Sequence, residues 1–205
     1  TGNPQITFFK IVYRRHTNFA MESIEQTFNG NVDFGKKVTA TVSRNGDLMH
    51  RVYLQVTLPQ VATAASGQAF RWLNWVGHVL LKNVEVEIGG QRIDKHYGDW
   101  LHIWNELTQT PGHQSGYANM VGNVPRLTQV ISGNAGTVTD CDTTSCIPET
   151  VLFVPLQFWF CRNPGLALPL IALQYHEVKF NLEFRAAAEC YWDNGTVTKP
   201  ALSAG

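Results

Sequence analysis

The sequence lacks the features that would direct a protein to a membrane, a nucleic acid or the secretory route. It has no run of about 18 apolar residues, which a bilayer-spanning helix requires, and its first four residues lack the basic and then apolar order of a signal peptide. Lys plus Arg and Asp plus Glu number 16 each, so there is no overall positive field to attract a polyphosphate backbone. We therefore expect a soluble protein without a specific nucleic-acid partner, and a near-neutral surface slightly favours self-assembly.

Cysteine is also scarce. The four residues Cys141, Cys146, Cys161 and Cys190 are too few and too unevenly spaced for a disulfide framework or a paired Cys-x-x-Cys zinc site. Free thiols are the simplest interpretation. Cys141 and Cys146 could close a disulfide at a loop tip in an oxidising compartment, which spacing alone does not decide.

The common enzyme motifs are absent as well. There is no P-loop, no dinucleotide-type Gly-x-Gly-x-x-Gly and no Gly-x-Ser-x-Gly elbow, because in residues 112–116 the serine comes one position too late. Metal-dependent jelly-roll enzymes hold their ion with closely spaced histidines, yet none of the seven histidines forms a His-x-His or His-x-x-x-His pair. The sequence therefore predicts no catalytic residue, no metal site and no cofactor.

A few weaker candidates have simpler explanations. His102 and Glu106 lie one helical turn apart, which is more typical of a hydrogen bond or a surface pair than of a metal site. The segment from Asp140 to Asp142 resembles the start of a calcium loop but lacks its later glycine and glutamate, so we expect a solvated acidic loop. Asn194 begins a formal N-glycosylation acceptor, Asn-Gly-Thr, which we expect to be unused without a secretory route.

One local basic cluster, at residues 10–16, is interleaved with aromatic residues. Such a cluster could contact nucleic acid or acidic lipid, and an ordinary subunit or strand-edge contact fits equally well. Its basic members are Lys10, Arg14, Arg15 and His16.

The clearest pattern that is present has a period of two, which is typical of half-buried strands. In residues 176–185 the apolar Val178, Phe180, Leu182 and Phe184 alternate with polar residues. Residues 52–58 and 84–88 follow the same rule, and Gly89-Gly90 predicts a hairpin that returns along residues 92–95. We expect further strands at residues 21–28 and 37–42.

Residues 151–160 are almost continuously apolar, which is typical of a strand covered on both faces. They are our candidate for contact with a neighbouring domain or subunit.

Two other segments interrupt the strand pattern. In residues 97–108 apolar side chains recur every three or four residues, which predicts a short helix whose aromatic stripe plugs the end of a sandwich core. Residues 109–149 are rich in Gly, Asn, Ser and Thr without a sustained period, and we expect a long functional loop, with a shorter one at 59–69. Many short strands, one helix and long loops favour an all-β sandwich.

Three long segments in order carry a family resemblance: GNPQITFFKIVYRRHTNF (2–19), IGGQRIDKHYGDWLHIWNELT (88–108) and FWFCRNPGLALPLIALQYHEVKF (158–180). Together they resemble the major capsid proteins of nucleocytoplasmic large DNA viruses, the group that includes algal viruses and iridoviruses. The resemblance implies a jelly-roll antiparallel β-sandwich, the first of two in tandem. It also implies homotrimers with pseudo-hexagonal outlines that tile an icosahedral virion shell around an internal membrane, with minor capsid proteins as further partners and assembly in the host cytoplasm.

The same resemblance divides the chain into three parts. Residues 1–20 would be an N-terminal arm, residues 21–185 the jelly roll, and residues 186–205 the start of a linker to a second jelly roll outside this sequence. The missing initiator Met and the abrupt end at Gly205 suggest a piece of a longer chain.

Two other classes remain open. A carbohydrate-binding jelly roll would place Trp72, Trp75 or Trp192 on an exposed face, and a metal-dependent jelly-roll enzyme would need distant histidines that fold together. Neither has a motif of the required kind.

Overall fold

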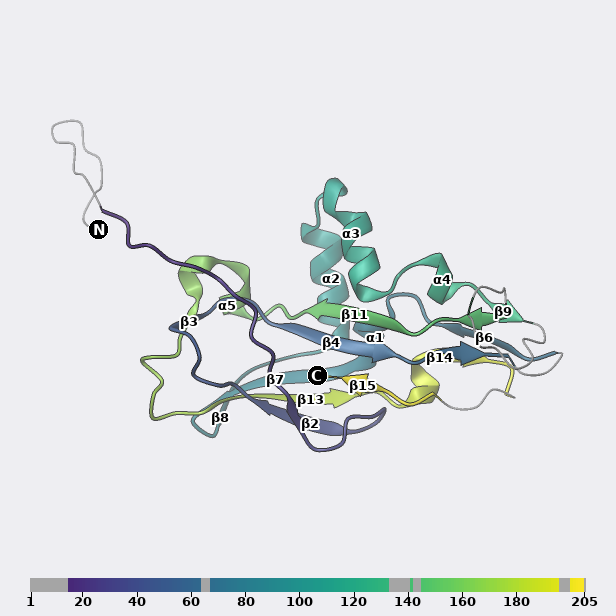
Figure 1. The fold of residues 1–205 in the computed structure, drawn as a ribbon, viewed down its shortest axis with the longest axis horizontal. Helices are drawn as coiled ribbons and strands as arrows, with labels where there is room; N and C mark the ends of the chain where they lie inside the picture. Colours follow the sequence, from purple (N-terminus) through teal and green to yellow (C-terminus); the bar gives the residue numbers. More distant parts are fainter. Residues whose placement is uncertain (1–14, 64–66, 133–140, 142–144, 196–199, 205) are drawn as a thin grey trace.

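The computed structural model describes residues 15–63, 67–132, 141, 145–195 and 200–204. These residues form two facing β-layers with the helices gathered on one side (Figure 1). One layer is an antiparallel sheet whose strands are, in spatial order, β1 (Phe28–Asn29), β2 (Lys37–Thr41), β13 (Val178–Phe184), β7 (Leu81–Ile88) and β8 (Gln91–His96).

The opposite layer is broken into shorter sheets. Its centre is a three-stranded sheet of β11 (Thr150–Pro155), β4 (Tyr53–Leu58) and β15 (Ser203–Ala204). The remaining strands form the sheets β10 (Cys146–Ile147) with β5 (Val61–Ala62), β14 (Tyr191–Asp193) with β6 (Ala69–Trp72) and β9 (Ile131–Ser132), and β12 (Leu168–Pro169) with β3 (Leu48–Met49).

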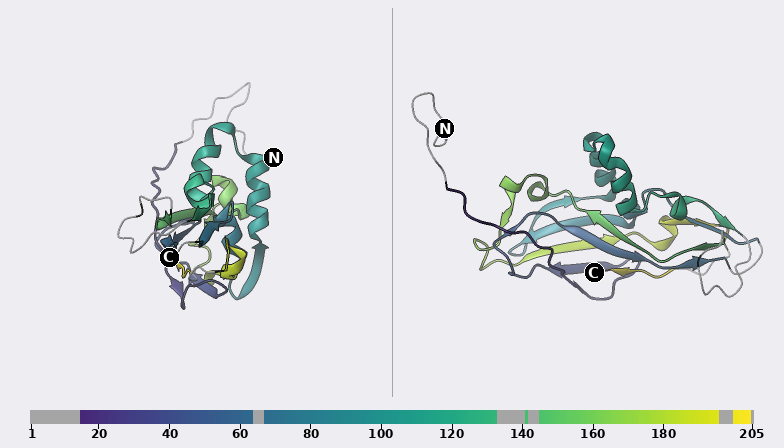
Figure 2. Two further views of the ribbon diagram at one scale, coloured as in Figure 1. Left: turned by 90° about the vertical axis from the view of Figure 1, so that its right-hand side faces the viewer. Right: turned by 45° about the horizontal axis from the view of Figure 1, so that its top comes forward.

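The helices are short, and most of them lie between β6 and β10 in chain order. They are α1 (Val76–Leu80), α2 (Gly98–Thr108), α3 (Pro111–Val121), α4 (Pro125–Thr128) and α5 (Trp159–Arg162), with 3-10 turns at Pro164–Leu166 and Ala187–Glu189. The teal helices α2 and α3 stand up from the β-layers in every view (Figures 1 and 2).

The alternating segments are strands, as predicted. Along β13 the side chains of Val178, Phe180, Leu182 and Phe184 are buried, while the intervening residues are partly exposed. The turn after β7 also matches, because Gly89 and Gly90 have φ angles of 60° and 83°, the left-handed values that a two-residue hairpin turn needs. The strands predicted at 37–42, 52–58 and 84–88 are likewise confirmed.

Three predictions about strands and loops were wrong. At residues 21–28 only Phe28 joins a strand, where it pairs with Ala40 of β2, and Met21 is 77% exposed, so residues 21–27 form no strand in the described chain. The strand predicted over residues 151–160 ends at Pro155; one further backbone bond, from the N–H of Leu156 to the carbonyl of Val52, follows before residues 159–162 form α5 instead of continuing the strand. Residues 109–149 contain the helices α3 and α4 and are not only a loop. Proline at the first helical position, Pro111, is favourable for the start of α3. The helix has almost no apolar stripe, so the sequence pattern did not reveal it.

The helix predicted at residues 97–108 is present as α2, but its aromatic stripe does not plug the core. Of the stripe only Leu101 is fully buried, whereas Tyr97 and Leu107 are 52% and 77% exposed. Trp100 and Trp104 are half-buried beneath the guanidinium of Arg162. The helix projects from the sandwich instead of closing it (Figure 2).

The chain beyond residue 185 contributes to the fold in two places. Strand β14 pairs with β6, and Tyr191 packs against the fully buried Phe70 and Trp72 at ring-centroid distances of 5.0 and 6.0 Å. Strand β15 then pairs with β4. The division into arm, jelly roll and linker stays a prediction, and any linker would include segments that pair with the sandwich.

The cysteines fall into two classes. Cys141 and Cys146 form a disulfide, so the free-thiol interpretation was wrong for this pair. Cys161 and Cys190 are free, and burial raises their pKa values to about 11 and about 12, which keeps both as neutral thiols near pH 7.

Loss of this disulfide should lower the free energy of unfolding modestly. The two cysteines are only five residues apart, so the bond removes little entropy from the unfolded chain, about 2 kcal/mol in the loop-closure model. Urea unfolding of the wild type with and without dithiothreitol, beside the Cys141→Ser/Cys146→Ser variant, measures this loss. The reductant should shift the wild type and leave the double variant unchanged; an equal shift in both would contradict the assignment.

Candidate assembly surfaces

The outer face of the five-stranded sheet is charged, and its charges pair with one another. Glu85 of β7 accepts from Lys95 at 2.7 Å, and Glu183 of β13 accepts from Lys82 at 2.7 Å. Hydrogen bonds from Lys82 and Asn83 lower the pKa of Glu183 to about 2. Such partly exposed pairs add little stability, but they make this face compatible with water.

The outer face of the three-stranded sheet is different. The inward side chains of β4 and β11, such as Val56 and Leu152, are fully buried, as expected in a sandwich. The outward positions carry no charged residue, although an antiparallel sheet normally exposes polar side chains. We call these positions of β4 and β11 the uncharged face: Tyr53, Gln55, Thr57, Val151, Phe153 and Pro155.

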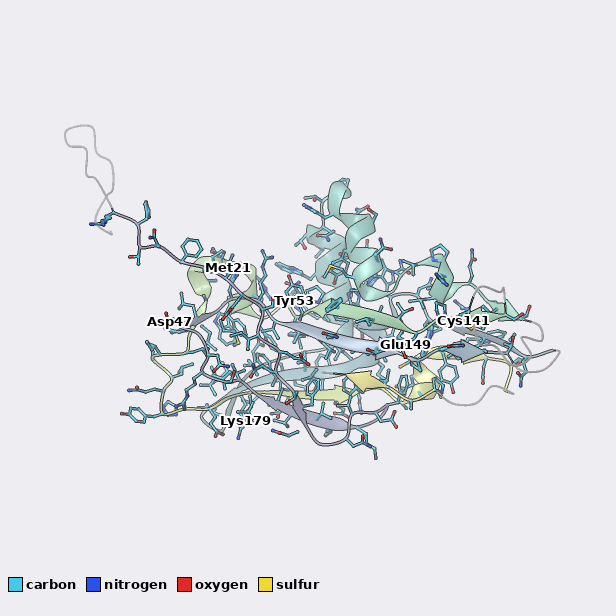
Figure 3. All side chains as sticks on the ribbon, in the orientation of Figure 1. Met21, Asp47, Tyr53, Cys141, Glu149 and Lys179 are labelled. Atoms are coloured by element: carbon cyan, nitrogen blue, oxygen red, sulfur yellow. A yellow bond between two sulfur atoms is a disulfide. The ribbon has the colours of Figure 1, made fainter. Side chains whose placement is uncertain are left out.

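Three large side chains dominate the uncharged face. Tyr53, Val151 and Phe153 are 46%, 44% and 43% exposed, and the strand register puts Phe153 beside Gln55 and Val151 beside Thr57. Charged residues appear only at the ends of the strands, where Arg51 precedes β4 and Glu149 precedes β11. In Figure 3 Tyr53 and Glu149 mark the two ends of this strand pair. A face that exposes large uncharged side chains between charged ends is typical of a protein interface.

Helices α1, α2 and α3 meet at a cluster of rings. The Nε2 atom of His78 lies 2.7 Å from the hydroxyl of Tyr117, the indole of Trp75 stacks on His78 with ring centroids 5.5 Å apart, and His102 lies beside both. Burial, assisted by the neighbouring His102, lowers the pKa of His78 to about 4, and burial raises the pKa of Tyr117. His78 and Tyr117 are therefore neutral at pH 7. The ring cluster connects α2 and α3, the helical projection, to the sandwich through α1.

The structure does not bring together the residues that could bind a metal ion. No hydrogen bond or ion pair joins His102 to Glu106, because His102 turns toward Trp75 while Glu106 is exposed. Within the described chain no group of three or more His, Cys, Asp or Glu could hold a metal ion. Among its helices none is long and apolar enough to cross a bilayer.

The tryptophans do not form an exposed platform. Trp72 is completely buried and Trp75 is half-buried, which leaves Trp192, 45% exposed, as the one accessible candidate of the three. The amide nitrogen of Asn194 donates to the carbonyl of Gly67, so the atom that a glycan would use is hydrogen-bonded within the protein.

Several predicted residues cannot be placed. Lys10, Arg14, Asp140 and Asp142 lie outside the described residues. Arg15 and His16 of the basic cluster are exposed, at the start of an extended segment that leaves the sandwich (Figure 1).

The sequence matches a family model described as "Major capsid protein N-terminus" over residues 7–203. The chain belongs to this family. Major capsid proteins of Phaeocystis pouchetii virus and Pyramimonas orientalis virus are 58% and 62% identical to it, over 97% and 95% of the chain but only 41% and 45% of their own lengths. This major capsid N-terminal chain therefore spans about two fifths of the length of the curated relatives that it matches.

Solved structures agree with the family. The chain is similar to PBCV-1 VP54, in a crystal structure fitted into a cryo-EM reconstruction of the virophage Sputnik, with a TM-score of 0.68 and 37% identity over 97% of this chain and 44% of VP54. The Faustovirus major capsid protein, with a TM-score of 0.64 at 14% identity over 94% of this chain and 47% of its own, supports the fold alone. The predicted jelly-roll β-sandwich and the predicted family are thus confirmed.

Proposed function

We propose that this chain is a structural building block of a virion shell, the first of two jelly rolls in a major capsid protein. The observation that carries the proposal is the family match over residues 7–203, joined to a fold shared with a viral capsid protein. The uncharged face agrees with this role, because a shell subunit needs broad surfaces that become dry on assembly.

The proposal includes the finer predictions made from the resemblance. The longer polypeptide would form homotrimers, and these capsomers would tile an icosahedral shell over an internal membrane with minor capsid proteins as partners, after assembly in the host cytoplasm. Residues 1–20 would act as an arm, residues 21–185 as the jelly roll and residues 186–205 as the start of the connection to the second domain. We infer a purely structural role without catalysis or a cofactor.

The mass in solution tests the shell-building role. Light scattering should give a trimer for the longer polypeptide that includes the second domain and a monomer for the chain described here, because a pseudo-hexagonal capsomer needs both jelly rolls from each subunit. A longer polypeptide that stays monomeric over a wide concentration range would contradict the proposal.

A further inference from the structure

We propose that Asn45 is a site of spontaneous deamidation, and that this modification loosens the end of the sandwich where β3 pairs with β12. The reaction needs no enzyme, and the inference does not depend on the shell-building role. It is carried by the Asn-Gly pairs of the sequence, which begin at Asn29, Asn45 and Asn194 and which the structure places in three different environments.

An asparagine that precedes a glycine can react with its own backbone. The glycine nitrogen loses its proton to water or hydroxide and attacks the side-chain Cγ, so an N–Cγ bond forms while the Cγ–Nδ2 bond breaks and ammonia leaves. Water then opens the resulting succinimide ring at either carbonyl. Opening at Cγ gives aspartate, and opening at the former backbone carbonyl gives isoaspartate, whose main chain runs through Cγ. Glycine favours the reaction because it has no Cβ to hinder the approach.

The pair Asn45-Gly46 is free to react. Both residues are exposed in the turn between β2 and β3. Within the described chain neither the side-chain amide of Asn45 nor the N–H of Gly46 makes a hydrogen bond, so nothing holds the reacting carbon and nitrogen apart. Asp47, labelled in Figure 3, belongs to the same turn, at one end of the sandwich.

The other two pairs are held in place. Asn29 lies in β1 and is paired with Thr39, so closing the ring would require its backbone to rotate out of the strand. The side-chain amide of Asn194 is bonded at both ends, because its Oδ1 accepts from the N–H of Ala69 at 3.1 Å and its Nδ2 donates to the carbonyl of Gly67. Turning Cγ toward the next backbone nitrogen would break both bonds. Equal dipeptides should therefore react at unequal rates.

The modification changes both the charge and the length of the β2–β3 turn. Hydrolysis adds one carboxylate next to Arg44, in a chain whose formal net charge is zero. Isoaspartate also inserts one extra carbon into the backbone shortly before β3. The carbonyl of Asp47 accepts from the N–H of Leu170 at 2.9 Å, immediately beside the pairing of β3 with β12. A longer turn should displace this carbonyl and weaken the pairing.

Peptide mass spectrometry of the longer polypeptide, incubated at mildly alkaline pH, measures the three rates. Trypsin places Asn29, Asn45 and Asn194 on separate peptides, and digestion in heavy-oxygen water labels any product that forms during the digestion itself. In the folded protein Asn45 should react about tenfold or more faster than the other two, because only its reacting atoms can approach each other. In urea the three rates should converge, because the contacts that hold the other two are lost.

A pair of glycine variants provides the second arm. Gly46→Ala should slow the reaction at Asn45 by about tenfold or more, and the fold should be kept because an added Cβ atom would meet nothing within 4 Å. Gly116→Ala adds a Cβ atom in equally open space and should leave the rate unchanged. Three equal rates in the folded protein would overturn the inference, as would a rate at Asn45 as low as the rates at the other two asparagines.

Hydrogen exchange tests the structural consequence. The isoaspartate form, separated by ion-exchange chromatography, should exchange the N–H of Leu170 about tenfold faster than fresh protein, because its bond to the Asp47 carbonyl is weakened. Asn45→Asp adds the charge without the extra carbon and should exchange like fresh protein. An unchanged rate in the isoaspartate form would overturn the proposed loosening, and equal acceleration in Asn45→Asp would overturn the role of the extra carbon.

Discussion

Acidification from pH 7 to pH 5 should lower the free energy of unfolding by about 2 kcal/mol for each of two buried histidines, His78 and His96. Burial is the main cause in both cases and lowers each pKa to about 4. In the unfolded chain both groups return to the ordinary value of 6.5. The unfolded state therefore binds more protons below pH 6.5, and stability falls until the pH reaches about 4.

The two histidines lie in different surroundings, so protonation of each should destabilise a different part of the protein. His78 would gain its proton beside the rings of Trp75, Tyr117 and a second imidazole, that of His102, and none of these three side chains is an anionic counterion. His96 packs on Phe158 with ring centroids 4.4 Å apart, between Asp94, which opposes the lowering of its pKa, and Arg162, which adds to it. Protonation of His78 should loosen the helical projection, and protonation of His96 should loosen the main core.

Urea unfolding at a series of pH values between 7 and 5 measures the effect in a range where most carboxylates stay ionised. His78→Gln and His96→Gln should each remove about half of the pH dependence, whatever their cost at pH 7. His16→Gln, at an exposed position, is the matched control and should keep the full dependence. A wild-type protein whose unfolding midpoint does not change over this range would contradict the neutral state of the two imidazoles.

Replacement of Gly98 by alanine should be among the most damaging single substitutions in this protein. Gly98 is the first residue of α2, and a Cβ atom there would lie 2.0 Å from the carbonyl oxygen of His78 and 2.6 Å from that of Leu81. Both contacts are with backbone atoms, which cannot rotate away as a side chain could. We expect a loss of more than about 4 kcal/mol, enough to unfold many domains.

Gly116→Ala is the control within the same helical projection. A Cβ atom at Gly116 in α3 would meet nothing within 4 Å, so alanine should stabilise the protein by about 0.5 to 1 kcal/mol through its higher helix propensity. Thermal unfolding of the two variants beside the wild type separates the close backbone approach from the general cost of changing a glycine. A Gly98→Ala protein that melts with the wild type would show that α2 does not approach α1 so closely.

The strands of five or more residues could be predicted because their signal is local, whereas the shorter strands could not. The alternation of Val178, Phe180, Leu182 and Phe184 reflects one buried face, and Gly89-Gly90 specifies a turn wherever the flanking strands pair. The α2 helix was equally visible from its period. Helix α3 was not, because its residues are mostly polar and exposed, and a helix without an apolar stripe resembles a loop in sequence.

The sequence by itself determined the longer strands, the α2 helix and the family, since periodicity and long ordered segments are properties of the chain read in order. Only the tertiary structure decided which apolar residues stay outside. Residues 151–160 are almost continuously apolar, yet Leu152 enters the core while Phe153 remains exposed. It also brought His78 to Tyr117, 39 residues away. Contacts of this kind depend on how sheets and helices pack across the sequence, which no local pattern records.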